Sequence, residues 1–286
     1  MKSRMRKIQD IGVLEREILG QKGHLVLPQV FEKNRLEPLR EYLNGRLEKL
    51  WDRFLEWSGQ GLEKNHSDYL VHSQNMKAYE ARGIPKDLRH FLRGEFDVET
   101  RLSQMVRRFL SSSEFKKVAA QIWGSEDIFF HYPPMLRFKI PQASEACVPP
   151  HQDSAYNQSL GPFLTLWLPL TTIDSEVGGV LFYEGSHHLG PLDHGPSGSW
   201  ESKAHFNESL YPVFSPAMEC GDLLVFIPDI VHASAPNLSS GNVVRLSIDV
   251  RVFGRAQKSK KAYYDPFSEI VHQPDPSEAL SEPRDE

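Results

Sequence analysis

The stretch Pro149-Pro150-His151-Gln152-Asp153 decides how the rest of the chain is interpreted. His151 and Asp153 are separated by one residue, and on an extended strand this spacing places both side chains on one face. An imidazole and a carboxylate on one face supply two ligands of a 2-His-1-carboxylate triad, which binds non-haem Fe(II) and leaves coordination positions open. The remaining chain must then supply a second histidine, an anchor for a co-substrate, and a sheet that holds them together.

His232 is the best candidate for the second histidine. It follows an apolar strand expected over residues 222–227 and a Pro228-Asp229 turn, and the run around it also has the composition of a strand. A closed sheet is needed to bring it to His151 and Asp153, which lie far upstream. Because a His-x-Asp pair is common by chance, the prediction depends on its combination with this later histidine and with a nearby arginine.

Arg245 is the predicted anchor for a 2-keto acid co-substrate. A guanidinium can hold the far carboxylate of such a molecule with two parallel hydrogen bonds. Along residues 245–251, polar and apolar residues alternate, so one polar face should point into the interior of a barrel. Arg251 lies on the same face and is the rival anchor, but it is further from His232. A purely structural ion pair of either arginine with Asp249 is the alternative.

The chain divides into a helical part followed by a strand-rich part. Apolar residues spaced three or four apart predict a helix over residues 36–57, and shorter helical pieces follow as far as Gly124. Short strands separated by Gly and Pro follow, which favours an antiparallel barrel or jelly roll. Helices that precede strands predict an α+β fold rather than βαβ units.

The same patterns suggest one domain between two flanking segments. The expected segments are an N-terminal arm at 1–22, a single domain at 23–255 with a helical part at 30–124 and a barrel core at 128–253, and a charged, partly disordered tail at 256–286. Residues 190–215 are a long polar insertion, which we interpret as a lid over the mouth of the barrel.

Composition narrows the class of partner. The 286 residues carry a formal net charge of −5, which does not favour nucleic-acid binding, so a small-molecule substrate is expected. Two cysteines argue against a disulfide scaffold and for a reducing compartment. There is neither an apolar run of about 18 residues nor a secretory signal pattern, so we expect no membrane span and a cytoplasmic protein.

Three groups of residues together resemble the phytanoyl-CoA dioxygenase family. They are the run His151-Gln152-Asp153-Ser154-Ala155-Tyr156-Asn157, the run Gly178-Gly179-Val180-Leu181-Phe182-Tyr183-Glu184-Gly185-Ser186-His187, and His232 with Pro236, Asn237 and Arg245. The likeness covers residues 20–253 and is strongest from 134 to 250. Jointly these motifs are specific.

The resemblance implies a double-stranded β-helix, a jelly-roll or cupin-like barrel, with flanking N-terminal helices. It implies Fe(II), 2-oxoglutarate and O2, with ascorbate as a stimulant. His151, Asp153 and His232 match the family's iron ligands, and Arg245 matches its 2-oxoglutarate anchor. The carboxylate at position 153 argues against the halide-binding variants of related enzymes. The implied reaction is hydroxylation of an unactivated C–H bond with release of succinate and CO2; the family is too broad to imply the substrate.

Other polar and aromatic residues near these motifs are candidates for binding. Trp167, Arg137 and Ser247 lie on strands beside the expected site and could contact the co-substrate. Tyr156 and Asn157 follow the metal-binding stretch and could reach the substrate. Core packing is the alternative for Trp167.

Two other classes of protein fit part of the pattern. A barrel with two histidines and a carboxylate can bind Zn(II) or Mn(II) and catalyse hydrolysis or isomerisation, but such an enzyme has no need of Arg245. A non-catalytic jelly-roll binding protein has no need of intact ligands. The complete set of ligands and anchor therefore favours the dioxygenase.

Overall fold

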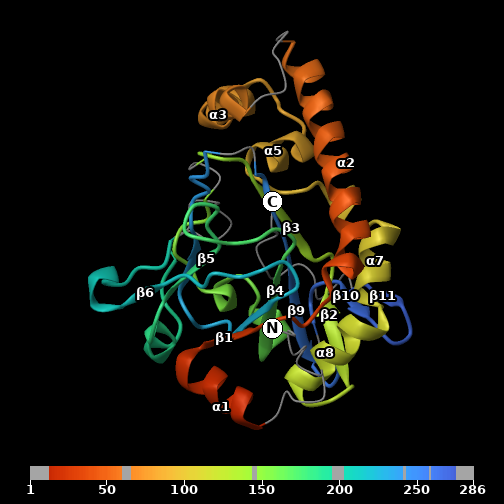
Figure 1. Cartoon of the computed structure of the whole chain (residues 1–286), viewed down its shortest axis with the longest axis vertical. Coiled ribbons are helices and arrows are strands. Elements are labelled where there is room, and N and C mark those ends of the chain that lie inside the picture. Colours follow the sequence, from red (N-terminus) through yellow and green to blue (C-terminus); the bar gives the residue numbers. More distant parts are fainter. Residues whose placement is uncertain are drawn as a thin grey trace, which may run out of the picture.

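The computed structural model describes residues 13–59, 66–143, 147–194, 203–240, 243–257 and 259–274, and the chain is described here within these ranges. Helices and two antiparallel sheets build an α+β fold (Figure 1). The α-helices are α1 (Val13–Lys22), α2 (Lys33–Ser58), α3 (His66–Gln74), α4 (Met76–Ala81), α5 (Lys86–Leu92), α6 (Val98–Arg101), α7 (Gln104–Leu110) and α8 (Ser113–Trp123). The strands are β1 (His24–Leu27), β2 (Ile128–His131), β3 (Met135–Lys139), β4 (Phe163–Pro169), β5 (Val180–Tyr183), β6 (Val213–Phe214), β7 (Leu223–Phe226), β8 (His232–Ser234), β9 (Arg245–Gly254), β10 (Tyr263–Asp265) and β11 (Ile270–His272).

Strand β9 is the centre of the larger sheet. This sheet has eight strands in the order β1-β7-β4-β9-β2-β10-β11, and β3 also pairs with β9. Along one edge β9 pairs with β4, and along the other it pairs first with β3 and then with β2. The smaller sheet has three strands in the order β6-β5-β8. The two sheets are separate, and they carry different parts of the site described below.

The two faces of β9 have different environments, as its alternating sequence predicts. Leu246, Ile248 and Val250 belong to the main apolar core, which also contains the buried residues of the helices. Arg245, Ser247, Asp249 and Arg251 share the opposite face because successive side chains of a strand alternate. Burial of one apolar face against helices thus directs four polar side chains toward the smaller sheet.

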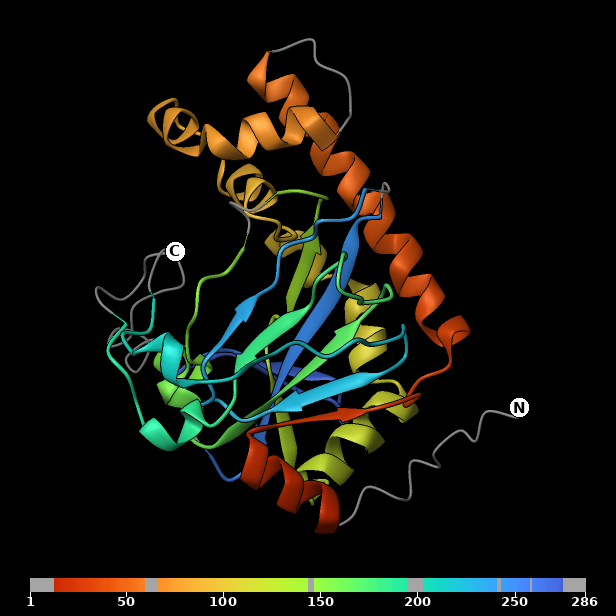
Figure 2. The ribbon, with the colours of Figure 1, turned by 60° about the vertical axis from the view of Figure 1, so that its left-hand side comes forward.

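Helices α2, α7 and α8 form a layer beside the larger sheet, whereas α1 and α3 lie toward its opposite ends (Figures 1 and 2). Helix α2 lies along this layer, and its apolar stripe, from Leu36 to Phe54, is buried as its spacing predicts. Helix α8 begins after Ser112, whose side chain accepts a hydrogen bond from the backbone N–H of Phe115, and it ends at Gly124 in the left-handed conformation. Gly124 is the end that the sequence indicates.

The antiparallel α+β class is confirmed, but two finer expectations are not met. Within the described ranges the two sheets do not join into one closed barrel. The expected strand through His151 and Asp153 is also wrong. His151 makes an isolated antiparallel bridge with His232, and a 3-10 helix, η3 (Asp153–Ala155), begins two residues later. The chain turns there because the N–H of Ser154 donates to the carbonyl of Pro228 instead of continuing a ladder.

The sequence after β9 forms more structure than its composition predicts. Strand β10 pairs with β2, and β11 pairs with β10, which extends the larger sheet beyond residue 256. The last part of the predicted tail, 275–286, lies outside the described residues. So do residues 195–202 of the expected lid, whereas 213–214 of the same insertion form β6 against β5. Nowhere in the described part of the chain does a helix have both the length and the apolar character that crossing a membrane requires.

Candidate metal and co-substrate site

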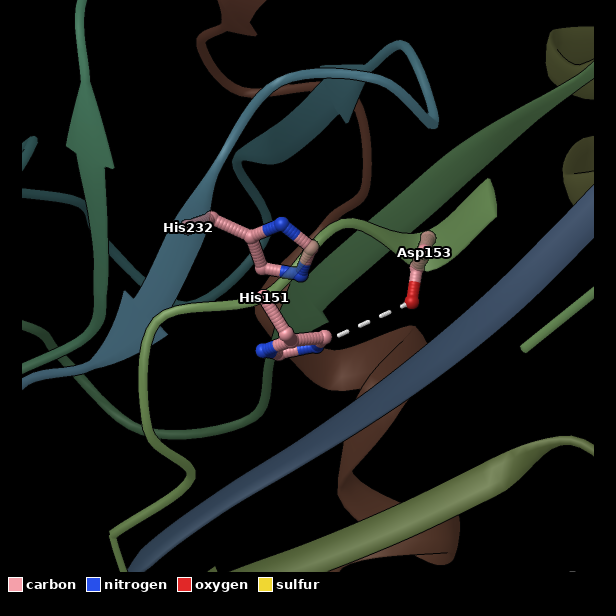
Figure 3. Close-up of side chains that lie close together, drawn as sticks. All are labelled: His151, Asp153 and His232. Carbon is pink, nitrogen blue, oxygen red and sulfur yellow. Dashed lines mark ion pairs between the residues drawn. The ribbon is translucent and has the colours of Figure 1, made fainter. Parts of the chain in front are cut away.

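Three predicted metal ligands meet between the two sheets (Figure 3). His232 is the first residue of β8, and His151 is joined to it by two backbone hydrogen bonds of 2.9 Å. Asp153 begins η3, and its Oδ1 lies 3.9 Å from Nε2 of His151. One ligand atom from each residue lies within 4.8 Å of the others. Although the segment is not a strand, Gln152 is extended, so His151 and Asp153 still face the same space.

Backbone carbonyls fix both imidazoles with Nε2 toward this space. Nδ1 of His151 lies 2.8 Å from the carbonyl oxygen of Pro149, and Nδ1 of His232 lies 3.1 Å from that of Ile230. A carbonyl oxygen can only accept, so each Nδ1 carries the proton and donates it. Each Nε2 then presents a lone pair, which is the form in which histidine binds a metal.

Burial keeps the two histidines neutral. Burial, together with the neighbouring His232, lowers the pKa of His151 to about 3. Burial also lowers the pKa of His232. Burial acts to raise the pKa of Asp153, but the charge of Arg251, its hydrogen bond and the other nearby groups together outweigh burial and hold this pKa well below its usual range. The set at neutral pH is therefore two neutral imidazoles and one carboxylate, which suits Fe(II).

Arg251 holds the carboxylate of Asp153. Its Nη2 lies 2.9 Å from Oδ1 and its Nε lies 3.4 Å from Oδ2. The hydroxyl of Thr165, on β4, donates to Oδ2 at 2.7 Å. Thr165 and Arg251 are directly opposite each other in the β4–β9 ladder, so neighbouring strands supply both donors. Arg251 is thus engaged at the metal end of the site, and this weakens its case as the co-substrate anchor.

Arg245 lies at the other end of the same face of β9. It is 2% exposed, and burial lowers the pKa of its guanidinium to about 10, so it remains charged at neutral pH. Its Nη1 makes only a long contact, 3.5 Å, with the carbonyl oxygen of Gly179. Its Nε and the hydroxyl of Ser247 are buried and have no hydrogen-bond partner among the described residues. Buried donors without partners are costly, so this end is built to receive an acceptor.

The backbone that faces Arg245 depends on a glycine. Gly178 has a φ of 66°, and a Cβ at this position would lie 2.1 Å from the carbonyl oxygen of Pro236. The next carbonyl, that of Gly179, accepts from the N–H of Ala235 as well as from Arg245. The Gly178-Gly179 pair therefore allows two segments to pack closely beside the anchor.

One pocket joins the two ends of the site. Its lining includes His151, Asp153 and His232 at one end and Trp167 and Arg245 at the other. The centre of the Arg245 guanidinium lies 5.8 Å from the Trp167 ring centroid, within the range of a cation–π contact. Trp167 is thus placed where the sequence predicts a co-substrate contact, and Ser247 lies on the same strand face beside Arg245.

Arg137 also lines the pocket, where it pairs with carboxylates. Its Nη1 lies 2.5 Å from Oε1 of Glu95, and its Nε lies 3.6 Å from Oδ2 of Asp249. Burial acts to raise the pKa of Glu95, but the charge of Arg137 and the neighbouring His90 act to lower it. The pKa of Glu95 falls to about 2. Glu95 precedes the strands and gave no sequence signal of this role. Arg137 therefore connects the helical layer to the site.

The residues after Asp153 are placed differently from their predicted role. The amide of Asn157 is buried and donates to the backbone carbonyl of Asp153 at 2.9 Å, which stabilises the turn. The Tyr156 ring packs edge-on against His151, with centroids 5.8 Å apart. Neither residue is part of the described lining of the pocket. Gln152 points away from the metal ligands, and its side-chain amide donates to the backbone carbonyls of Gly190 and Asp229.

Sequence reasoning missed the partners of Asp153. The alternation along β9 places Arg251 on the correct face, but no sequence pattern says which carboxylate it contacts. Thr165 gave no signal, because a threonine in a strand is ordinary. The sequence suggests Asp249 as an ion-pair partner of Arg245 or Arg251, whereas in the structure it lies 3.6 Å from Nε of Arg137. Burial raises the pKa of Asp249, whereas the charge of Arg137 acts to lower it.

The residues present fit both cofactors that the sequence suggests. The triad offers two imidazole nitrogens and a carboxylate oxygen on one side of a pocket. The other end offers a buried guanidinium and a hydroxyl with unused donor atoms, which suit the far carboxylate of 2-oxoglutarate. Iron and 2-oxoglutarate would therefore occupy the two ends of one continuous pocket.

Comparison with known proteins gives the same assignment. The family profile described as phytanoyl-CoA dioxygenase (PhyH) matches residues 19–245. A 1-deoxypentalenic acid 11-beta-hydroxylase of Streptomyces exfoliatus is 31% identical over 150 residues, which are 48% of this chain and 52% of that protein. The homologous hydroxylase of Streptomyces arenae matches to the same extent. The chain spans about half the length of the curated relatives it matches.

Solved structures share the fold. The non-heme alpha ketoglutarate dependent carbocyclase SnoK from nogalamycin biosynthesis superposes with a TM-score of 0.56 at 15% identity, over 87% of this chain and 86% of that one. EvdO2 from Micromonospora carbonacea var. aurantiaca, complexed with 2-oxoglutarate, has a TM-score of 0.56 at 19% identity, over 87% and 94%. The profile match spans most of the sequence, and the chain therefore belongs to the phytanoyl-CoA dioxygenase family.

Proposed function

We propose that this protein is a non-haem Fe(II)- and 2-oxoglutarate-dependent dioxygenase that hydroxylates an unactivated C–H bond of a small-molecule metabolite. The observation that carries the proposal is one pocket lined by both His151, Asp153 and His232 and the buried anchor Arg245. Succinate and CO2 are the expected co-products. The larger and smaller sheets correspond in this proposal to the two halves of a double-stranded β-helix, with the N-terminal helices on its outside.

Each end of the pocket has a separate task. His151, Asp153 and His232 hold the metal, and they leave the remaining coordination positions for 2-oxoglutarate and O2. Arg245 binds the far carboxylate of 2-oxoglutarate, with Ser247 as a second donor and Trp167 as a wall. The bound iron and co-substrate supply oxidation of a C–H bond coupled to oxidative decarboxylation. The chain's contribution is to orient both and to keep water out.

The small-molecule class of the substrate follows from the family and from the two related hydroxylases, which act on 1-deoxypentalenic acid. Apolar carboxylic acids of that kind are therefore the first compounds to screen. Stimulation of succinate release above the substrate-free rate would identify a substrate. This screen addresses the substrate alone and leaves the cofactor assignment to a separate experiment.

Anaerobic binding of 2-oxoglutarate to the Fe(II)-loaded protein tests the proposal. Chelation of iron by a 2-keto acid produces a visible charge-transfer absorption, and titration of that band gives the affinity. We expect the band with 2-oxoglutarate, and succinate release once O2 and ascorbate are admitted. A protein that binds Fe(II) but shows neither the band nor 2-oxoglutarate binding would contradict the proposal. A Zn(II) or Mn(II) hydrolase or isomerase would then fit better.

A further inference from the structure

Three donor atoms surround the carboxylate of Asp153, and none of them is a predicted metal ligand. They are Nη2 and Nε of Arg251 and Oγ1 of Thr165. The side chains of Asp153 and Arg251 are 3% and 13% exposed, and Thr165 is 1% exposed, so water competes little for these bonds. We call Arg251 and Thr165 together the carboxylate clamp.

The clamp does not treat the two oxygens equally. Oδ2 receives two donors, the Thr165 hydroxyl at 2.7 Å and Nε of Arg251 at 3.4 Å. Oδ1 receives one, Nη2 of Arg251 at 2.9 Å. An ionised carboxylate has about two lone-pair sites on each oxygen. Oδ2 is therefore saturated, whereas Oδ1 keeps one site unused.

The oxygen with the unused site is the one that lies beside His151. Oδ1 is the atom that lies 3.9 Å from Nε2 of His151. The clamp thus leaves a lone-pair site free on the carboxylate oxygen that lies beside the His151 imidazole. A carboxylate bound through both oxygens would use one more coordination position, which a 2-keto acid and O2 require.

We propose that Arg251 and Thr165 are positioning residues that hold Asp153 ready to bind the metal through Oδ1 alone. The inference rests on the proposed ligand set of His151, Asp153 and His232. In the metal-free protein, the clamp also supplies the opposite charge that a buried carboxylate needs. It fixes the rotamer beforehand, so metal binding does not have to order the side chain.

The charge of Arg251 and the geometry of its hydrogen bonds have opposite effects on metal binding. Its positive charge repels an arriving cation, whereas its two hydrogen bonds orient the carboxylate. Removal of the whole side chain would change both effects together. Arg251→Lys keeps the charge but loses the planar fork, so it isolates the geometric contribution. Thr165→Val removes one donor at nearly constant shape and leaves every charge in place.

The test is metal affinity, measured by calorimetric titration of the full-length protein with Mn(II). Loss of a hydrogen-bonding partner of a metal ligand typically weakens metal binding or activity by about 10- to 100-fold. We expect Thr165→Val to weaken Mn(II) binding by about 10-fold and Arg251→Lys by at least that much. The visible spectrum of the Co(II)-loaded variants should also change, since it reports the number and geometry of the ligands.

Two matched variants serve as controls. Thr172→Val removes a hydroxyl that donates to Oε2 of Glu219 at 3.1 Å on the surface. Arg255→Lys alters an arginine just beyond β9 that pairs with Asp265 at 2.9 Å. Both should keep the Mn(II) affinity and the Co(II) spectrum of the wild type. Thermal unfolding of all four metal-free variants separates loss of stability from loss of binding.

The outcomes distinguish the clamp from the ligand assignment. If Thr165→Val and Arg251→Lys lose only stability, and their Mn(II) affinity and Co(II) spectrum match the wild type, the clamp is merely structural and the inference is wrong. If Arg251→Lys does not fold, Thr165→Val decides alone. Failure of the wild type to bind Mn(II) or Co(II) would instead overturn the ligand set, and the clamp with it.

Discussion

The two ends of the polar face of β9 carry the same residue type in opposite situations. Arg251 is paired with Asp153 at 2.9 Å, and the carboxylate is further satisfied by Thr165. Arg245 is more deeply buried but has no ion pair within 4.0 Å in the described part of the chain, and its Nε has no acceptor there. The carboxylate at the metal end is therefore already paired with a positive charge before any ligand binds, whereas the guanidinium at the co-substrate end still needs an anion.

Loss of a metal ligand should have the largest effect at the metal end. His151→Ala removes one imidazole but leaves the Asp153–Arg251 pair intact, so the fold should persist. We expect no measurable succinate release and strongly weakened Fe(II) binding, because a two-ligand site no longer holds the metal. Circular dichroism verifies the fold. Turnover retained by this variant would refute the ligand assignment.

Arg245→Ala should impair binding at the co-substrate end alone. A hydrogen bond to a charged group contributes about 1.5–3 kcal/mol, so loss of the anchor should weaken 2-oxoglutarate binding by about 10- to 100-fold. Mn(II) binding without 2-oxoglutarate should be nearly unchanged. Calorimetric titration with each ligand separately measures the two affinities. Equal loss of both would indicate that Arg245 supports the structure instead of binding the co-substrate.

The pH dependence of stability tests the electrostatics near the metal end. His131, on β2, is buried, and burial together with the charges of Arg251 and Lys261 lowers its pKa well below the usual value. The folded protein then binds fewer protons than the unfolded chain, so stability is lost as the pH falls below about 6.5. One such group contributes a loss of about 1.4 kcal/mol per pH unit in that range.

His131→Gln, which cannot titrate there, provides the comparison. Urea unfolding of the metal-free protein at several pH values between about 7 and 5 gives the slope. We expect the variant to show a shallower decline of the free energy of unfolding than the wild type. Identical slopes would mean that His131 takes up a proton in the folded protein, contrary to its surroundings.

Ser247→Ala should have the smallest effect. The hydroxyl is buried without a partner, so its removal costs no interaction in the ligand-free protein. A neutral hydrogen bond contributes about 0.5–1.5 kcal/mol, and we expect 2-oxoglutarate binding to weaken by up to about 10-fold. Stability should stay equal or rise slightly. An unchanged affinity would show that Arg245 binds the carboxylate of 2-oxoglutarate without help from this hydroxyl.

Much of the fold could be predicted from local patterns. The spacing of apolar residues gave helix α2, and Gly124 marked the end of α8. The alternation along β9 separated a polar from an apolar face. These signals are visible in the sequence because helix and strand periodicity and end residues act over a few neighbours. Strands β10 and β11 were missed because each is only three residues long, which is too short for a periodic pattern; β10 pairs with β2 and β11 pairs with β10.

The residue types of the proposed site can be recognised in the sequence alone. Metal binding requires imidazole and carboxylate groups, and binding of a carboxylate favours a guanidinium. These requirements select His151, Asp153, His232 and Arg245 near the expected strands. Only the tertiary structure shows that Arg251 is ion-paired, with Asp153, whereas Arg245 has no ion pair in the described part of the chain. That difference depends on the register of β4 against β9, which places Thr165 beside Arg251, and on the turn at Asp153. Register and turns of this kind are set by packing over the whole sheet.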